Sequence, residues 1–208
     1  MITKVLSSGD PLAISHAIEI LQKGGLVAFP TDTVYGVGAL AFNGQAIEGI
    51  YLAKDRPVEK AIPVLIADAD DLAKVCALVP EIALKLGARF WPGPLTIVLP
   101  KHPDLPPEIS SGPTVGVRIP NHPVARSLLR LAGPMAVTSA NLSGKANPCD
   151  AQEVQDQLGG RIALIIDGGR TPGGVPSTVV DCTRQELQVL RAGPISKEEI
   201  MVIAGQIY

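Results

Sequence analysis

The sequence has few aromatic residues and little net charge. Phe, Trp and Tyr make up 3% of its 208 residues, too few for an obvious platform on which nucleic-acid bases could stack. The formal net charge is −2 at pH 7, which argues against a protein that binds nucleic acid through an overall positive charge. A local basic groove stays open as an interpretation.

Cysteine is also scarce. The three cysteines, Cys76, Cys149 and Cys182, are far apart, and no two of them have the C-x-x-C spacing. This pattern argues against a zinc site and against a disulfide framework. We therefore expect three reduced thiols and a reducing compartment.

Long apolar runs are missing as well. No uninterrupted run approaches the about 18 residues that a membrane-spanning helix needs. Residues 1–10 lack the apolar core of a signal peptide. We expect a cytoplasmic protein without a membrane partner.

Hydrophobic residues make up 46% of the chain, enough for a substantial core, and 21 Gly and 19 Pro residues indicate frequent turns. Helical and strand patterns alternate without a linker or a break in composition, which predicts one α/β domain over 1–208 with a largely buried sheet. The patterns predict helices at 11–23, 45–54, 81–90, 123–131 and 151–158, one beginning at Asp68, and a terminal helix opened by a capping box of Ser196 and Glu199. They predict strands at 26–29, 63–66, 95–99, 114–119, 135–138 and 162–166, and an antiparallel pair at 177–182 and 186–190.

Two short polar motifs far apart in the sequence are the strongest functional signals. K-D-R-P at 54–57, with Lys60 beyond it, places three cations within about two helical turns. An arginine fork beside lysine point charges suits phosphate groups, although a solvated surface patch is the simpler alternative. T-S-A-N-L-S-G at 138–144 follows a predicted strand and offers the side chains of Ser139 and Asn141. Together they predict a pocket for a polyanion.

The segment P-T-D-T-V-Y-G-V-G at 30–38 follows a buried strand, where α/β proteins often place a ligand-binding loop. The alternative is a turn that uses Thr and Gly for its geometry. Residues 36–41 also fit the pattern G-x-G-x-x-A of dinucleotide-binding proteins. These glycines lie too far from the end of the strand, so we do not predict a dinucleotide site.

Arg118 stands within an otherwise apolar strand. A buried arginine without an anionic partner is costly, so its partner is either a structural carboxylate or the carboxylate of a substrate. The glycine-rich stretch 167–178 is either a lid or a long hairpin loop. No Ser-His-Asp or Cys-His set is evident, so any chemistry should rest on positioning and electrostatics.

An ordered set of motifs covers nearly the whole chain. The set comprises P-T-x-T-V-Y-G-x-G at 30–38, K-x-R-P at 54–57, W-P-G-P-L-T at 91–96, V-R-x-P at 117–120, S-A-N-x-S-G at 139–144, S-T-V-V-D at 177–181 and L-R-x-G at 190–193. In this order the motifs resemble those of the YrdC-like threonylcarbamoyl-AMP synthases. The resemblance implies a YrdC-like twisted mixed α/β sheet flanked by helices, with a concave basic groove.

The resemblance also implies an activity. The family makes L-threonylcarbamoyladenylate and pyrophosphate from L-threonine, bicarbonate and ATP, a nucleotidyltransferase reaction that serves threonylcarbamoyl-adenosine modification of tRNA. Mg²⁺ would accompany ATP, with no metal ligands assigned in the chain. The implied partners are a downstream tRNA threonylcarbamoyl transferase complex and, through the groove, tRNA or double-stranded RNA.

By matching motif, the family's site residues fall on particular positions of this sequence. The residues expected to face L-threonine are Thr33, Arg118 and Ser177. Those expected to face ATP are Arg56, Lys60, Thr114, Ser139, Asn147 and Arg191. The expected catalytic set is Lys54, Arg56, Ser139 and Asn141, although Asn141 could instead only brace its loop.

Two departures accompany the resemblance. Some members have a threonine-contacting histidine after the K-x-R segment, where this sequence has Leu65 or its neighbours. Longer members carry a linker and a second domain, whereas this sequence ends at Tyr208, so we expect the single-domain form. The alternatives are a double-stranded RNA or tRNA-binding module, a weakly active paralogue and, least favoured, carbamoyl-adenylate chemistry of the hydrogenase-maturation type.

Overall fold

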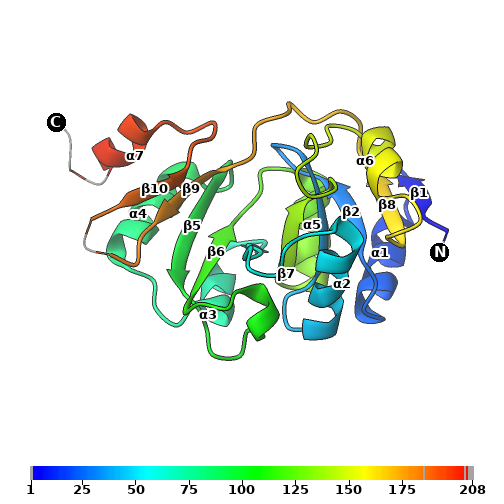
Figure 1. Cartoon of the computed structure of the whole chain (residues 1–208). Coiled ribbons are helices and arrows are strands. Elements are labelled where there is room, and N and C mark those ends of the chain that lie inside the picture. The colour runs from blue at the N-terminus through cyan, green and yellow to red at the C-terminus, as the bar shows by residue number, and fades with distance from the viewer. Residues whose placement is uncertain (1, 185, 204, 206–208) are drawn as a thin grey trace.

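The computed structural model describes residues 2–184, 186–203 and 205. One mixed ten-stranded sheet runs through them in the order β1-β8-β2-β3-β7-β4-β6-β5-β9-β10 (Figure 1). Its strands are β1 (Lys4–Ser7), β2 (Val27–Pro30), β3 (Tyr35–Leu40), β4 (Val64–Leu65), β5 (Leu95–Pro100), β6 (Thr114–Arg118), β7 (Met135–Ser139), β8 (Leu164–Asp167), β9 (Thr178–Asp181) and β10 (Gln188–Arg191).

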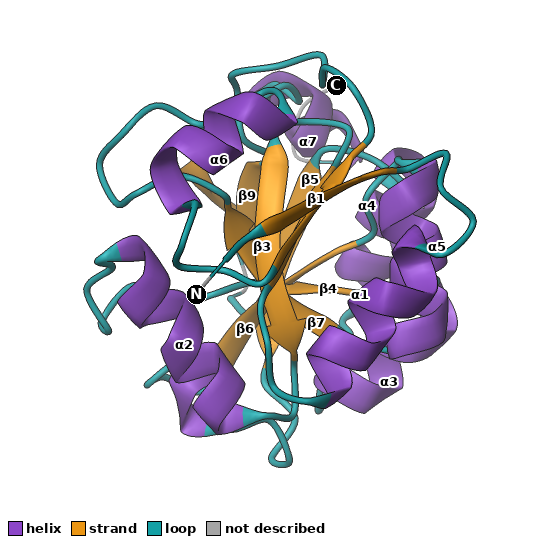
Figure 2. Cartoon of the chain, turned by 90° about the vertical axis from the view of Figure 1, so that its right-hand side faces the viewer, coloured by secondary structure: helices purple, strands orange, loops and turns teal. Residues whose placement is uncertain are grey.

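Helices pack on both sides of this sheet. They are α1 (Ala13–Gln22), α2 (Gly44–Lys54), α3 (Leu72–Val75), α4 (Glu81–Phe90), α5 (Pro123–Ala132), α6 (Ala151–Leu158) and α7 (Lys197–Ile203), with single 3₁₀ turns at Ala69–Asp71 and Pro107–Ile109. Figure 2 shows α1 and α5 on one side of the central strands and α2 and α6 on the other. Two buried apolar clusters match this division, one including α1 and α5, and a larger one including α2 and α6.

The predicted mixed α/β sheet flanked by helices is confirmed. The antiparallel pair near the end of the chain is β9 with β10. The Ser196–Glu199 capping box is present in both directions, with Ser196 N donating to Glu199 Oε2 and Glu199 N donating to Ser196 Oγ. The helix at Asp68 is reduced to a 3₁₀ turn and the four-residue α3.

The prediction that 30–38 is a loop was wrong for its second half. Only 31–34 form a turn, and Tyr35 begins β3, which pairs with β2 and β7. The two glycines of the segment lie inside β3, where a Cβ at Gly36 would come within 2.7 Å of Val137 Cγ1 and one at Gly38 within 2.8 Å of Ala136 O. The glycines therefore allow close packing against β7, which explains why they do not form a dinucleotide loop.

No helix among the described residues is both long enough and apolar enough to cross a membrane. The prediction of a single domain over 1–208 stays a prediction, and Tyr208 lies outside the described residues.

Candidate active site

A cavity of about 300 Å³ opens above the middle of the sheet, around the two-residue strand β4. Strands and loops supply all of its walls. The lining residues are Thr31, Thr33, Val34, Gly36, Arg56, Ala61, Ile62, Pro63, Leu65, Thr96, Val98, Gly116, Arg118, Val137, Thr138, Ser139, Pro176, Ser177, Val179 and Arg191. Segments far apart in the sequence thus meet here, and the lining includes six of the predicted site residues.

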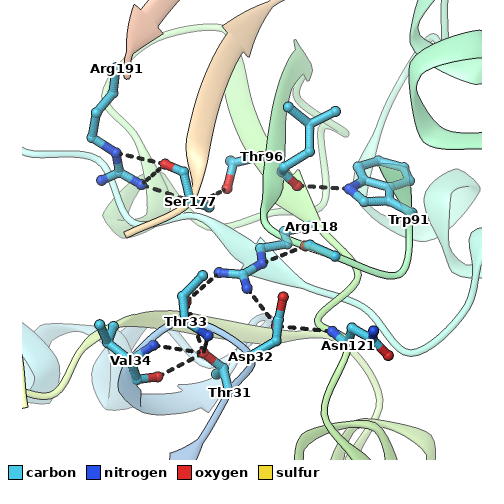
Figure 3. A network of polar contacts seen from close by, with 12 residues as sticks. Thr31, Asp32, Thr33, Val34, Trp91, Thr96, Arg118, Asn121, Ser177 and Arg191 are labelled. Atoms are coloured by element: carbon cyan, nitrogen blue, oxygen red, sulfur yellow. Dashed lines mark hydrogen bonds and ion pairs between the residues drawn. The ribbon is translucent and has the colours of Figure 1, made fainter. Parts of the chain in front are cut away.

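Arg118 ends β6 and is 6% exposed. Its Nε donates to Gly93 O at 3.0 Å, Nη1 to Thr33 Oγ1 at 3.0 Å and Nη2 to Asp32 Oδ1 at 2.6 Å (Figure 3). A guanidinium has five N–H groups, so one on each terminal nitrogen has no acceptor among the described residues. Those two donors can hold a carboxylate. The sequence left open whether the partner of Arg118 is a structural carboxylate or a substrate carboxylate, and the structure shows a structural one, Asp32.

The turn at 31–34 positions both groups that contact Arg118. Thr31 Oγ1 accepts from the backbone N–H groups of Thr33 and Val34 and donates to Val34 O, which closes a turn directly after β2. Asp32 Oδ1 also accepts from Asn121 N at 2.9 Å. The turn therefore holds the buried hydroxyl of Thr33 and the carboxylate of Asp32 against the guanidinium of Arg118.

Ser177 joins the second arginine of the cavity to the threonine-rich wall. Arg191, at the end of β10, donates from Nε and Nη2 to Ser177 O at 3.0 and 2.8 Å, and from Nη2 to Ser177 Oγ at 3.1 Å. Ser177 Oγ also lies 2.7 Å from Thr96 Oγ1. A Cβ at Gly193 would come within 2.4 Å of Thr178 N, so only glycine lets the chain after Arg191 pass this close to Ser177.

Arg56 enters the cavity from the turn after α2. Helix α2 ends at Lys54 because Asp55 adopts a left-handed conformation with φ 50°, and Arg161 donates to its carboxylate at 2.8 Å. The reversal aims Arg56 at the 60–61 backbone, where Nε donates to Lys60 O and Nη2 to Ala61 O. Three N–H groups of Arg56 keep no acceptor among the described residues.

Lys54 points elsewhere. It is 1% exposed, does not line the cavity, and its ammonium contacts the backbone oxygens of Ser139 and Asn141 and, at 3.4 Å, Asn141 Oδ1. Its own carbonyl accepts from Ser143 N at 2.8 Å. Lys54 thus fastens the end of α2 to the loop after β7.

Asn141 braces that same loop. Its Oδ1 accepts from Ser139 Oγ at 2.5 Å, and its Nδ2 donates to Leu142 O and Lys145 O. Ser139 lines the cavity, whereas Asn141 is buried and does not line it.

The remaining predicted ATP residues lie outside the lining of the cavity. Thr114 shares a face of β6 with Gly116 and Arg118, because alternate residues of a strand point the same way. Asn147 donates from Nδ2 to Gly174 O at 3.4 Å. Lys60 is exposed, and its backbone carbonyl accepts hydrogen bonds from Arg56 Nε and from the Tyr51 hydroxyl.

The charges of the cavity are mutually unfavourable when no anion is present. Burial lowers the pKa of Arg191, and the positive charges of Arg118 and Arg56 lower it further. Burial also lowers the pKa of Arg56, and it lowers that of Arg118 against the opposing effect of Asp32. An entering anion would relieve this repulsion, which is the electrostatic signature of an anion-binding site.

Sequence reasoning missed several residues of the site. Asp32 was the variable position of its motif, and Thr96 was noted only as the end of W-P-G-P-L-T. Thr31 and Thr138 also line the cavity. Leu65 lines it too, in the segment where some family members have a threonine-contacting histidine. A hydroxyl and an arginine that meet only in the folded structure are far apart in the sequence, so no regular spacing between them predicts the contact.

No group of three or more His, Cys, Asp or Glu side chains within the described ranges could hold a metal ion. The carboxylate nearest to the cavity cations is Asp32, which is already paired with Arg118. The cavity residues therefore suit phosphate oxygens and a carboxylate better than a bare cation.

Comparisons with known proteins place this arrangement in a family. A model of the Sua5/YciO/YrdC family, described as telomere recombination, matches residues 19–193. A threonylcarbamoyl-AMP synthase of Bacillus subtilis (strain 168) is 47% identical over 210 residues, covering 100% of this chain and 60% of that protein. The chain thus spans about three fifths of the length of this relative.

Two solved structures are similar throughout. The structure of Pyrococcus abyssi Sua5 complexed with L-threonine has a TM-score of 0.94 and 42% identity, covering 100% of this chain and 62% of that one. The structure of Escherichia coli YciO has a TM-score of 0.87 and 28% identity, covering 96% of this chain and 100% of that one. The predicted family is confirmed, and this chain belongs to the Sua5/YciO/YrdC family.

Proposed function

We propose that this chain synthesises L-threonylcarbamoyladenylate from L-threonine, bicarbonate and ATP and releases pyrophosphate. One observation carries the proposal: three arginines converge on one cavity, and each has N–H groups without an acceptor among the described residues. A reaction between an amino acid and a nucleoside triphosphate brings both a carboxylate and a polyphosphate to one place. The names of the relatives agree with this substrate pair.

L-Threonine binds at the Arg118 end of the cavity. The two N–H groups of Arg118 that have no acceptor among the described residues hold its carboxylate in a fork, with the Thr33 hydroxyl bonded to Arg118 and the Ser177 hydroxyl in the same cavity lining. Asp32 keeps the guanidinium in this orientation through its 2.6 Å bond. Leu65 and Val137 offer an apolar wall to the methyl group of the substrate.

ATP binds across the other arginines. Arg56 and Arg191 face its phosphates, Ser139 adds a hydroxyl, and the nucleotide extends along the face of β6 toward Thr114. Asn147 and Lys60 contact it from beyond the cavity wall. Lys54 and Asn141 complete the catalytic set from below, by holding the loop that carries Ser139.

The chemistry requires positioning rather than a protein nucleophile. The amine of threonine adds to CO₂ derived from bicarbonate and loses a proton, which gives a carbamate. A carbamate oxygen attacks the α-phosphorus of ATP, and the bond to pyrophosphate breaks. The arginines hold both anions in line and neutralise the charge that develops on the phosphate oxygens.

Mg²⁺ would enter with ATP, bound by phosphate oxygens and water, because the described residues offer no carboxylate cluster near the cavity. The enzyme would act as a cytoplasmic nucleotidyltransferase. Its product would pass to a tRNA threonylcarbamoyl transferase complex, and contact with tRNA or double-stranded RNA would use a wider basic groove around the same cavity.

Mass spectrometry tests the proposal directly. The protein is incubated with ATP, Mg²⁺, L-threonine and ¹³C-bicarbonate, and the labelled adduct is measured with each component omitted in turn. We expect labelled threonylcarbamoyl-AMP only in the complete reaction. Arg56→Ala should abolish most of it, and Arg89→Ala should not, because Arg89 lies outside the cavity against the Phe90 ring.

Two results would contradict the proposal. A folded sample that binds ATP but forms no adduct would contradict the proposed synthesis. Unchanged turnover in Arg56→Ala would contradict the role of that cation.

A further inference from the structure

Two buried hydroxyl groups meet in the wall of the cavity, one on Thr96 of β5 and one on Ser177 just before β9 (Figure 3). Their Oγ atoms lie 2.7 Å apart, and the residues are 3% and 4% exposed. Each hydroxyl carries a single proton, so only one of the two can donate in this bond. The pair therefore has one proton left for another acceptor.

The surroundings favour Thr96 as the donor. Ser177 Oγ already accepts from Arg191 Nη2 at 3.1 Å. Thr96 Oγ1 has no polar partner other than Ser177 among the described residues. If Thr96 donates, Ser177 accepts twice and keeps its own proton free, and a hydroxyl that accepts hydrogen bonds becomes a stronger donor.

Packing fixes the direction of the Thr96 hydroxyl. A Cβ added at Gly116 on the neighbouring strand β6 would come within 3.0 Å of Thr96 Cγ2, so the methyl group of Thr96 lies directly over that glycine. A β-branched side chain has few χ1 rotamers, and this contact selects one of them. With its methyl group over Gly116, Thr96 presents its hydroxyl to Ser177.

We propose that Thr96 is a positioning residue, which donates to Ser177 and so directs the Ser177 proton toward an oxygen of the bound amino acid. The inference rests on the proposed function, in which Ser177 contacts L-threonine. The Thr96 hydroxyl therefore strengthens the binding of the amino acid and has no effect on the binding of ATP.

Three substitutions separate this role from a structural one. Thr96→Val keeps the shape and the methyl contact with Gly116 but removes the hydroxyl. Thr96→Ser keeps the hydroxyl. Thr178→Val is the matched control, because Thr178 is fully buried and its hydroxyl bonds to Ile195, away from the cavity.

The measurements are isothermal titration calorimetry with L-threonine and steady-state KM values for L-threonine and ATP. Thr96→Val should weaken L-threonine binding and raise its KM by about 10- to 100-fold, because Ser177 loses the hydrogen bond that orients its own contact to the substrate, with the KM for ATP changed less than about threefold. Thr96→Ser should restore most of the affinity. Thr178→Val should bind L-threonine as the unchanged protein does.

Three outcomes would overturn the inference: unchanged L-threonine binding in Thr96→Val, an equal loss in Thr96→Ser, or an equal loss in Thr178→Val. A wild-type protein that neither binds L-threonine nor forms the adduct would instead overturn the proposed function, and the inference with it. Calorimetry thus distinguishes the two failures, because it reads binding without turnover.

Discussion

Arg118 and Lys54 are both buried cations in sequence motifs, yet their surroundings differ. Arg118 has a carboxylate partner in Asp32, lines the cavity and has two N–H groups without an acceptor in the described part of the chain. Among the described residues Lys54 has only neutral oxygens as partners, from the end of β7 and the loop after it, and it lies outside the lining of the cavity.

The difference separates two uses of a positive charge. A guanidinium can satisfy a structural partner and a ligand at the same time, because its five donors point in several directions. The compact ammonium of Lys54 is surrounded by oxygens of two residues and fastens a loop. The Arg118 region therefore serves the substrate, and the Lys54 region serves the scaffold that carries Ser139.

The largest effect should follow from changing the fork of Arg118. Arg118→Lys keeps the charge beside Asp32 but loses the paired donors, so kcat/KM for L-threonine should fall about a thousandfold, or about 4 kcal/mol. ATP binding, measured by calorimetry, should change little. Equal losses for both substrates would show that Arg118 does not distinguish them.

Lys54→Met should act on folding as well as on turnover. It removes the ammonium that donates to the backbone oxygens of Ser139 and Asn141, so the free energy of unfolding should fall by about 2–4 kcal/mol. The KM values for ATP and L-threonine should rise together, because the whole loop loosens. Urea unfolding with circular dichroism gives the first quantity. A fully stable variant that loses only ATP binding would make Lys54 a phosphate ligand instead.

The pH dependence of stability sharpens the same contrast. Burial, aided by the charge of Arg56, lowers the pKa of Lys54 from 10.5 to about 7. Between these values the unfolded chain binds more protons than the folded one, so this lysine makes the protein more stable as pH rises. The unfolding free energy of the wild type relative to Lys54→Met should therefore increase from pH 7 to pH 10. A constant difference would mean that Lys54 keeps its usual pKa.

The smallest effect should come from Lys60. Its side chain is exposed and lies outside the lining of the cavity, so Lys60→Ala should raise the KM for ATP only about threefold. Because an exposed charge is screened, the effect should fade when salt is raised toward 0.5 M. A larger and salt-insensitive loss would make Lys60 a close, desolvated phosphate ligand and not a screened outer contact.

The sequence predicted the mixed α/β sheet and all three arginines of the cavity, because local patterns and the family's ordered motifs indicate them. It did not predict that β3 begins at Tyr35, since its two glycines mimic a loop and only the packing against Val137 and Ala136 explains them. It placed Lys54 in the site by its motif. Whether a cation faces a ligand or a carbonyl depends on the turn at Asp55, which no spacing rule reveals.

A crystal structure of the protein with L-threonine and a non-hydrolysable ATP analogue tests the central contrast most directly. We expect the threonine carboxylate on the two free N–H groups of Arg118, the phosphates on Arg56 and Arg191, and Lys54 still on the oxygens of Ser139 and Asn141. A phosphate bound by Lys54, or a threonine carboxylate bound away from Arg118, would contradict the account.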